Sequence, residues 1–328
     1  ALASALFAST AAFAQAIPVS NEAELKTALS DTSADIVLTQ DITLSGEWIP
    51  IGTKEAPYMG TFDGQGHAIK GLTITTKADN LGFFSFIGST ATVKNVSFTG
   101  AKVLGNKQAA IVAGQAENAT ISNVYVSGYV TGRDHVGTIV GDARGDANVS
   151  ADGTTISNCV STAAALSSDN QAGGIAGWTN LGVFEYNVAY GAVTAPNGGA
   201  AGICSMIDNN GHASFIGNVS AIPYAKGGNN RTSGILGWKN GSGCAIVDDD
   251  QNLSSDATQY FVGGNLTAAA DIKFDENNEG INGIVTPAAD LKTAATYTTA
   301  GFSADVWNLV DGQYPTLKTQ AAMENAIY

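Results

Sequence analysis

The chain has 328 residues and carries 29 acidic side chains against 15 basic ones, a formal net charge of −14. Such an acidic surface excludes nucleic acids and anionic membranes as partners, and it is a poor match for polyanionic sugars. Charged residues make up only 13% and hydrophobic ones 44%, which excludes a disordered chain. The 39 glycines and many Ser, Thr and Asn residues favour β-structure. Three cysteines, Cys159, Cys204 and Cys244, are too few for a disulfide framework.

Residues 1–16, ALASALFASTAAFAQA, are small and apolar and end in an A-x-A cleavage pattern. We interpret this segment as the remnant of a secretory signal peptide, with Ile17 as the first mature residue. No later apolar run approaches the roughly 20 residues that a membrane span needs. The sequence therefore predicts an exported protein, secreted or held at the cell surface, with no transmembrane segment.

Residues 17–34 contain a predicted capping helix. The stretch 21–30, NEAELKTALS, is amphipathic, with Asn21 in the N-cap position and Glu24 three residues later. Strand-like residues, ADIVLTQDITLS, follow directly. A repeat solenoid must cover its open ends to avoid edge-to-edge association, and this helix could cover the first coil.

Residues 35–260 contain a repeat marked by a G-x-I-x-G pattern, clearest in GTIVG, GGIAG and SGILG. The central isoleucines lie 28, 36, 28 and 32 residues apart, and Phe84 occupies a related place upstream. We interpret them as a structural ladder made of Ile111, Ile139, Ile175, Ile203 and Ile235.

A second marker is an asparagine in segments such as ATISNVYV and VFEYNVAY. Its copies lie 28, 35, 29 and 31 residues apart, and Asn252 is a weaker sixth copy. The five clear copies are Asn95, Asn123, Asn158, Asn187 and Asn218.

Two independent markers thus give one period near 30 residues, which indicates a solenoid or a propeller. The segments between the markers are short alternations typical of strands, and a propeller blade needs about 40 residues or more. We therefore predict a parallel β-helix of six or seven coils. Isoleucines would point inward, asparagines would pair their amides from coil to coil, and coils would stack at about 4.8 Å.

Residues 261–328 are interpreted as a closing coil, a second capping helix and a tail. The stretch 287–301 is helix-like, with Pro287 near its start and Gly301 as its stop. This helix is predicted to cap the last coil.

Segments 48–74 and 81–88, the three Gly-Ile motifs, and the ending GFSADVWNLVDGQYPTLK (301–318) together resemble bacterial GLUG-repeat proteins, named for a Gly-Leu-any-Gly motif. The resemblance covers about residues 35–318, although Leu appears here only as Ile. It implies a right-handed parallel β-helix on an exported or surface protein. Such repeats accompany adhesins and also flank catalytic domains, including immunoglobulin-A-cleaving metalloproteases. The H-E-x-x-H signature of those metalloproteases is absent, since none of His67, His135 and His212 has the spacing.

An enzymatic alternative is a polysaccharide lyase or glycoside hydrolase on a pectate-lyase-like β-helix. A lyase on acidic sugars needs basic side chains together, but the three arginines fall in different loops. A glycosidase needs two carboxyl groups on one face, about 5–10 Å apart. Asp134 beside His135 is one candidate. The run Asp248, Asp249 and Asp250 is another, and it could also bind calcium through its oxygens, although it matches no known loop motif and could equally be a solvated turn.

Trp178, Met206 and Trp238 each follow a marker isoleucine by three residues. In stacked coils the two tryptophans would lie two coils apart, about 9–10 Å. Exposed at that distance, they could stack on a neutral glycan, with Met206 between them; the alternative is packing under a loop. An Arg-Gly-Asp tripeptide at 144–146 is short enough to arise by chance.

We predict from these features an exported, non-catalytic repeat module, such as an adhesin, that binds a neutral glycan or a surface protein. No cofactor is expected apart from the calcium considered above, and the protein is expected to be a monomer.

Overall fold

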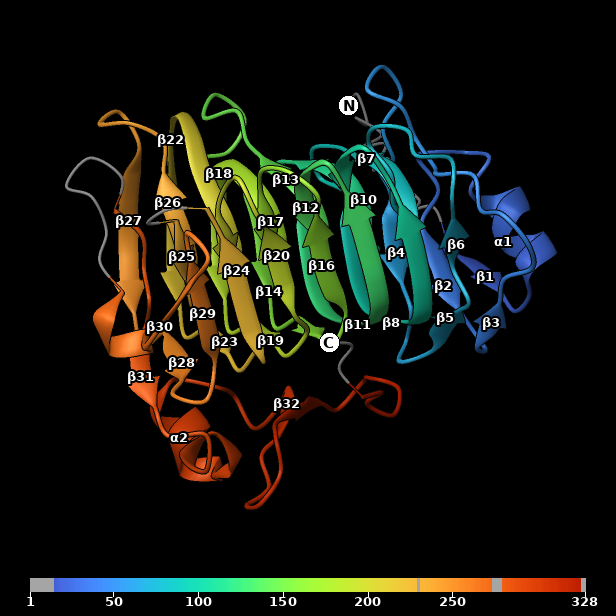
Figure 1. The fold of residues 1–328 in the computed structure, drawn as a ribbon. Coiled ribbons are helices and arrows are strands. Elements are labelled where there is room, and N and C mark those ends of the chain that lie inside the picture. Colours follow the sequence, from blue (N-terminus) through green and yellow to red (C-terminus); the bar gives the residue numbers. More distant parts are fainter. Residues whose placement is uncertain (1–14, 229–230, 273–278, 326–328) are drawn as a thin grey trace, which may run out of the picture.

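The computed structural model describes residues 15–228, 231–272 and 279–325. These residues form a right-handed parallel β-helix of about eight turns, which confirms the predicted fold class and adds to the predicted six or seven coils. Figure 1 shows the coils side by side, from helix α1 at the blue end to strand β27 at the orange end. Most of the signal-peptide segment, residues 1–14, lies outside the described residues.

Each coil places its strands in stacks that pair in parallel with the coils on either side. A small five-stranded sheet contains β9 (Lys107–Ala109), β12 (Asp134–Gly137), β17 (Ala172–Gly173), β21 (Ala200–Ala201) and β25 (Thr232–Ser233). After a sharp turn, the next stack contains β7 (Phe84–Ile87), β10 (Ala113–Glu117), β13 (Val140–Arg144), β26 (Leu236–Lys239) and the first halves of β18 (Ala176–Glu185) and β22 (Cys204–Ile216).

The third stack contains the second halves of β18 and β22, with β1 (Ile17–Val19), β2 (Ile36–Leu38), β4 (Thr61–Asp63), β14 (Thr154–Ser157), β27 (Ala245–Asp250) and the beginnings of β8 (Thr92–Leu104) and β11 (Thr120–Gly132). The middle parts of β8 and β11 join the fourth stack with β3 (Ile42–Thr43), β5 (Ala68–Lys70), β15 (Val160–Ser161), β19 (Val188–Ala189), β23 (Val219–Ser220), β28 (Leu253–Ser255) and β31 (Ile284–Thr286). Their ends join the fifth stack with β6 (Thr73–Ile74), β16 (Ala164–Ser167), β20 (Val193–Ala195), β24 (Tyr224–Gly227) and β29 (Gln259–Val262).

The remaining elements lie outside these stacks or at the ends of the solenoid. They are β30 (Asn265–Thr267), which pairs antiparallel with β29, the antiparallel pair β32 (Trp307–Asn308) and β33 (Thr316–Leu317), helices α1 (Glu22–Ala28) and α2 (Ala294–Thr299), and the 3-10 helices Ala269–Asp271 and Asp290–Lys292. Among the described residues, no helix is both long and apolar enough to cross a bilayer.

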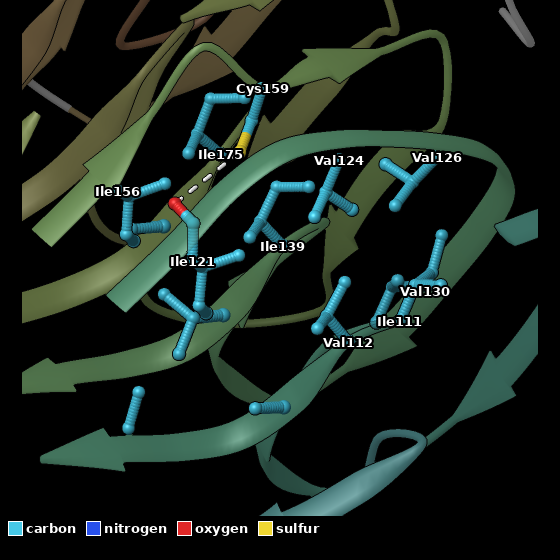
Figure 2. Packing of buried hydrophobic residues seen from close by; sticks show 14 of the residues in the cluster. Ile111, Val112, Ile121, Val124, Val126, Val130, Ile139, Ile156, Cys159 and Ile175 are labelled. Atoms are coloured by element: carbon cyan, nitrogen blue, oxygen red, sulfur yellow. Dashed lines mark hydrogen bonds between the residues drawn. The ribbon is translucent and has the colours of Figure 1, made fainter. Parts of the chain in front are cut away.

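The interior is a continuous apolar core whose aliphatic side chains stack from coil to coil, as Figure 2 shows. Strand pairing places Ala113, Val140, Ala176, Cys204 and Leu236 in one row. The residues immediately before them form the next row, and all are fully buried: Val112, Ile139, Ile175, Ile203 and Ile235. Four of the five predicted ladder isoleucines are therefore confirmed in register. Ile111 is buried, but its place in that row belongs to Val112, one residue later.

The sharp turn of the G-x-I-x-G motif explains its glycines. A Cβ atom on Gly173 would lie 1.9 Å from the carbonyl oxygen of Ala176, and one on Gly177 would lie 2.4 Å from the backbone of His135 in the preceding coil. Any side chain at either position would displace backbone, so the motif fixes a close approach that only glycine permits.

The predicted asparagine ladder is two ladders. Asn95, Asn123 and Asn158 share one row at a corner, each with a positive φ of 52–55° that asparagine tolerates well. The Asn123 amide donates to the Asn95 side-chain oxygen, 3.1 Å, and Asn95 donates to Asp63, 3.1 Å. The partly exposed side chains of this first ladder pair as expected over its first two coils.

Asn187 and Asn218 belong to the neighbouring row instead, together with Asn252, and they point into the core. The Asn187 amide donates to Asn218, 3.0 Å, and the Asn218 amide donates to Asn252, 3.0 Å. The backbone N–H groups of Asn187 and Asn218 donate to the same oxygens, at 3.1 and 2.9 Å. The prediction of a single row is therefore wrong by one residue, and in a strand one residue moves the side chain from outside to inside.

The N-terminal end is covered as predicted. Helix α1 begins after Asn21, whose side chain accepts a hydrogen bond from the Glu24 N–H, 3.0 Å. The Glu24 carboxylate in turn accepts from the Ser20 N–H, 2.8 Å, and Leu25 is buried in the core. Strand β1 precedes the helix and already pairs with β2, so the pairing of coils within the described residues includes Ile17.

Residues 287–325, which we call the clasp, do not cap the last coil. They lie along the flank of the solenoid, below it in Figure 1, and α2 packs there. Clasp and flank share an apolar cluster formed by Tyr125, Val160, Val188, Tyr190, Val219, Leu253, Leu291, Tyr297, Ala300, Phe302, Trp307 and Leu317. The prediction of a C-terminal capping helix is wrong, because the helix packs on an outer apolar row of the flank that runs from Tyr125 to Leu253.

Two other segments contribute to the C-terminal end. Ile281 pairs with Leu236 in an antiparallel bridge, and Ala269 and Ile281 join the core cluster. Asn282 holds them together, since its side chain donates to the Ala269 carbonyl, 3.0 Å.

Candidate functional site

On the outer surface of the solenoid, the side chains on either side of the sharp turn form two rows that run across several coils. The row on the small sheet contains His135, Gln171, Gly199 and Arg231, since its paired neighbours are Val136, Ala172, Ala200 and Thr232. The row on the other side of the turn contains Asp142, Trp178, Met206 and Trp238. Contacts between the two rows define what we call the turn stripe.

Trp178, Met206 and Trp238 lie in register, with Met206 between the tryptophans as predicted, and they form a small apolar cluster of their own. They are only 3%, 3% and 5% exposed. The prediction that two indole faces are exposed to a glycan is therefore wrong, and packing is the correct alternative.

The opposite row and a nearby arginine cover these rings. The His135 ring stacks on Trp178 with 5.7 Å between ring centroids and 6° between planes, and the Arg144 guanidinium lies 5.0 Å from the Trp178 ring centroid. The Arg231 guanidinium lies 3.6 Å from the Trp238 ring centroid. These contacts are cation–π and stacking interactions that bury the indoles under polar side chains. Arg144 is also the first residue of the Arg-Gly-Asp tripeptide, so that arginine is held against the fold.

Replacing both Trp178 and Trp238 by alanine is expected to lower the free energy of unfolding by several kcal/mol, because truncating one buried Trp costs about 3–5 kcal/mol. Urea unfolding followed by circular dichroism measures the change. An unchanged midpoint combined with loss of ligand binding would instead make the rings a binding surface.

Asp142 is fully buried and is paired on both carboxylate oxygens. His135 Nδ1 lies 2.6 Å from Oδ1, while Arg144 donates to Oδ2 from Nη2 at 2.6 Å and from Nε at 3.2 Å. A buried carboxylate needs such partners to offset the loss of its hydration. Asp134, the nearby acid considered for catalysis, lies 3.7 Å from His135 Nε2. The Asp142 carboxylate, fully buried and hydrogen-bonded on both oxygens, therefore holds the turn together.

The charge of His135 depends on these neighbours. Burial by itself lowers the pKa of His135, but the hydrogen bond and negative charge of Asp142 outweigh it, so the pKa lies above its usual 6.5. Asp134 adds to the increase and Arg144 opposes it. Because the folded state binds the proton more tightly, this pair stabilises the fold fully below the unfolded pKa and loses that contribution as the pH rises through the folded pKa.

We therefore expect the free energy of unfolding of the parent protein to fall more steeply above pH 6.5 than that of His135→Asn. Asparagine is chosen because residue 135 has a φ of +50°. Urea titrations at several pH values measure the slope, with His212→Asn as the control. Parallel curves for the parent and His135→Asn would contradict the assigned pairing.

Asp248, Asp249 and Asp250 lie exposed on strand β27. Successive strand residues point to opposite faces, so Asp249 points away from the other two, and it accepts from the Asn252 amide, 2.7 Å. In the described part of the chain, no group of three or more His, Cys, Asp and Glu side chains is placed to bind a metal. The geometry therefore does not provide the convergent oxygens of a calcium site at this run.

A groove of about 350 Å³ lies between the solenoid and the clasp, and we call it the flank groove. Tyr190 and Tyr314 meet there with ring centroids 5.0 Å apart and planes tilted by 56°. The solenoid contributes Thr162, Tyr190, Ala221, Ile222, Pro223, Ser255 and Ala257, and the clasp contributes Ala288, Tyr314, Met323, Glu324 and Asn325.

The C-terminal tail that walls the groove is tied to the solenoid by hydrogen bonds. The Glu324 N–H donates to the Tyr125 hydroxyl, 2.7 Å, and the Ala321 N–H donates to Ser97 Oγ, 2.8 Å. Ser127 donates to the Glu324 carboxylate. Sequence reasoning missed this groove because its two walls are distant in the chain. Its one local signal is Tyr190, whose neighbours in the row are the smaller Thr162 and Ala221.

Fold and site together place the chain in the class of right-handed parallel β-helices with a docked C-terminal segment. No protein-family model matches the chain. A crystal structure from Bacteroides ovatus, of a protein named as a candidate immunoglobulin A1 protease, is similar with a TM-score of 0.77 at 21% identity over 93% of both chains. A structure named IgA1 protease reaches a TM-score of 0.49 at 14% identity, over 94% of this chain and 26% of its own.

One curated relative shares sequence. A stretch of 111 residues, 34% of the chain, is 35% identical to halomucin from Haloquadratum walsbyi (strain DSM 16790 / HBSQ001). The match spans about 1% of the length of halomucin.

Proposed function

We propose that the protein is an exported, non-catalytic β-helical module of the GLUG-repeat type that binds an extracellular glycan or protein, as an adhesin does. The flank groove is the observation that carries this proposal. It is preformed, it combines two tyrosines with hydroxyl and carboxylate groups, and its volume lies in the range typical of ligand pockets.

The chemistry of the acidic groups favours binding over catalysis. The buried Asp142 is held by His135 and Arg144, and the three aspartates of β27 do not converge. The polysaccharide-active alternative would need a free pair of carboxyl groups on one face. The alternative would gain support from sugar release in the experiment below.

Export and monomeric state complete the proposal. The A-x-A pattern before Ile17 supports secretion or surface display. The clasp buries the outer apolar row of the flank within one chain, which supports a monomer.

A glycan array and an array of purified extracellular glycoproteins, each run with the parent protein, test the proposal. The glycoproteins are used before and after enzymatic deglycosylation. A reducing-sugar assay, with the glycans of the array as substrates, is run in parallel. Binding without sugar release is expected. Release of reducing ends or of unsaturated products would overturn the non-catalytic assignment, and absence of binding on both arrays would overturn the binding role.

A further inference from the structure

We infer that a pocket on the fifth stack, distinct from the flank groove, binds an acidic sugar residue such as a uronic or sialic acid through its carboxylate. The pocket has a volume of about 520 Å³ and forms where the chain leaves this stack on four successive coils. We call it the cationic pocket, and it is lined by Lys77, Gly105, Asn106, Thr131, Gly132, Arg133, Leu166, Ser167 and Ser168.

The charge of this pocket is opposite to that of the whole chain. Two cations line it and, among the described residues, no carboxylate does, although acidic side chains outnumber basic ones 29 to 15 in the chain. Lys77 is exposed and forms no ion pair within the described part of the chain. Arg133 Nη1 lies 3.9 Å from Asp169 Oδ2, which is beyond hydrogen-bond distance. Both cationic groups can therefore bind a ligand, and the planar arginine fork matches the geometry of a carboxylate.

The carboxylates that lie near these cations in the sequence are held by other groups. Asp79 and Asp169 each accept the side-chain amide of an asparagine on the next coil, at 2.7 and 3.0 Å. Asp134 lies 3.7 Å from His135 Nε2. Lys102, which faces outward on the same stack, adds positive charge to this side of the solenoid. Net charge therefore does not describe this surface, and an anionic group is the complementary ligand here.

The other lining residues favour a sugar over a simple anion. The half-buried Leu166 offers an apolar surface to the C–H groups of a pyranose ring. The hydroxyls of Thr131 and Ser168 have no hydrogen-bond partner among the described residues, and both side chains are at least partly exposed. The volume lies in the range of small-molecule sites. A simple anion would use only the two cations, whereas an acidic sugar uses the apolar side chain and the hydroxyls as well.

The test titrates the full chain with small probes and follows NMR chemical shifts. Methyl β-D-glucuronide and methyl α-N-acetylneuraminate are the acidic probes, methyl β-D-glucoside is the neutral match of the glucuronide, and acetate is a carboxylate without a sugar. At least one acidic probe is expected to bind about tenfold or more tighter than the glucoside, the effect of a hydrogen bond to a charged group, and also tighter than acetate. Added salt is expected to weaken this binding.

Charge-removing variants locate the binding. Arg133→Gln and Lys77→Gln are each expected to weaken the acidic probe about tenfold, and the double variant is expected to lose the preference over the glucoside. Lys54→Gln is the matched control, because it removes the same charge at an exposed position that does not line the pocket. All three side chains are exposed, so the melting temperature should stay near that of the parent.

Several results would overturn the inference. They are equal binding of the glucoside and the acidic probes, no binding of either acidic probe, and unchanged affinity in Arg133→Gln. Acetate that binds as tightly as the glucuronide would show a general anion site and overturn the sugar assignment. An equal loss in Lys54→Gln and Arg133→Gln would show an effect of net charge instead of this pocket. The proposed function rests on the flank groove and on the arrays, so it is tested separately from the cationic pocket.

Discussion

Ile203→Asp is expected to unfold at least the central coils. Ile203 is fully buried in the row between Ile175 and Ile235 and belongs to the apolar core cluster. An unpaired carboxylate placed there loses its hydration without gaining a partner, a penalty of at least several kcal/mol that is comparable with the whole stability of many domains.

Circular dichroism and urea unfolding measure this loss. Asn210→Asp is the matched control, because it adds the same charge on the same strand, β22, at an exposed position. A melting temperature of Ile203→Asp equal to that of the parent would mean that the inward row is assigned incorrectly.

Asn218→Ala is expected to destabilise the protein by about 3–5 kcal/mol. Its side-chain oxygen accepts from the backbone and the side chain of Asn187, and its amide donates to Asn252 and to the Phe184 carbonyl, 2.8 Å. Alanine would leave several of these buried groups unpaired, at about 1–3 kcal/mol each, partly offset by relaxation.

Asn123→Gly is the control for this prediction, since it removes an asparagine from the outer row while keeping the positive φ accessible. The difference between the two variants in the free energy of unfolding, measured with urea, gives the contribution of the buried asparagine row to stability. A loss in Asn218→Ala no larger than in Asn123→Gly would show that the inner amides contribute no more than the outer ones.

The repeat can be predicted from the sequence because each coil needs glycine at its sharp turn and apolar residues at its inward positions. The register of the repeat, however, depends on which residue of the motif is aligned between coils. Residue identity alone favours Ile111, whereas the glycines place Val112 in line. Gly114, Gly141 and Gly177 each lie two residues after an inward residue, where backbone from the preceding coil leaves no room for a Cβ atom. Glycine is the stricter marker here, since many apolar residues fit an inward site.

The asparagines show the same limit. Asn158 and Asn187 belong to similar motifs, yet Tyr186 occupies the corner that Asn158 occupies one coil earlier. Because side chains alternate between the two faces of a strand, a shift of one residue exchanged a corner amide for a buried one, and spacing near 30 residues cannot resolve such a shift.

Exposure could not be read from the sequence either. The row that holds Trp178 also holds Asp142 and Met206, so the row by itself does not indicate whether the indole is exposed. In the structure, His135 and Arg144 cover the Trp178 ring. Likewise, the flank groove requires Tyr190 and Tyr314 to meet, and no local pattern states where the clasp will dock.

Docking of the clasp also depends on correct stacking of the coils. Trp307 Nε1 reaches the Asn158 side-chain oxygen at 3.0 Å, while the tail reaches Tyr125 and Ser97, which belong to earlier coils. Ser97, Tyr125 and Asn158 lie on three consecutive coils, so the clasp can reach all three only when these coils have stacked in register. A chain with one slipped coil could satisfy some of these contacts but not all of them. Docking of the clasp therefore favours the chain in which these three coils are stacked in register, through contacts that join residues about 150 to 220 positions apart.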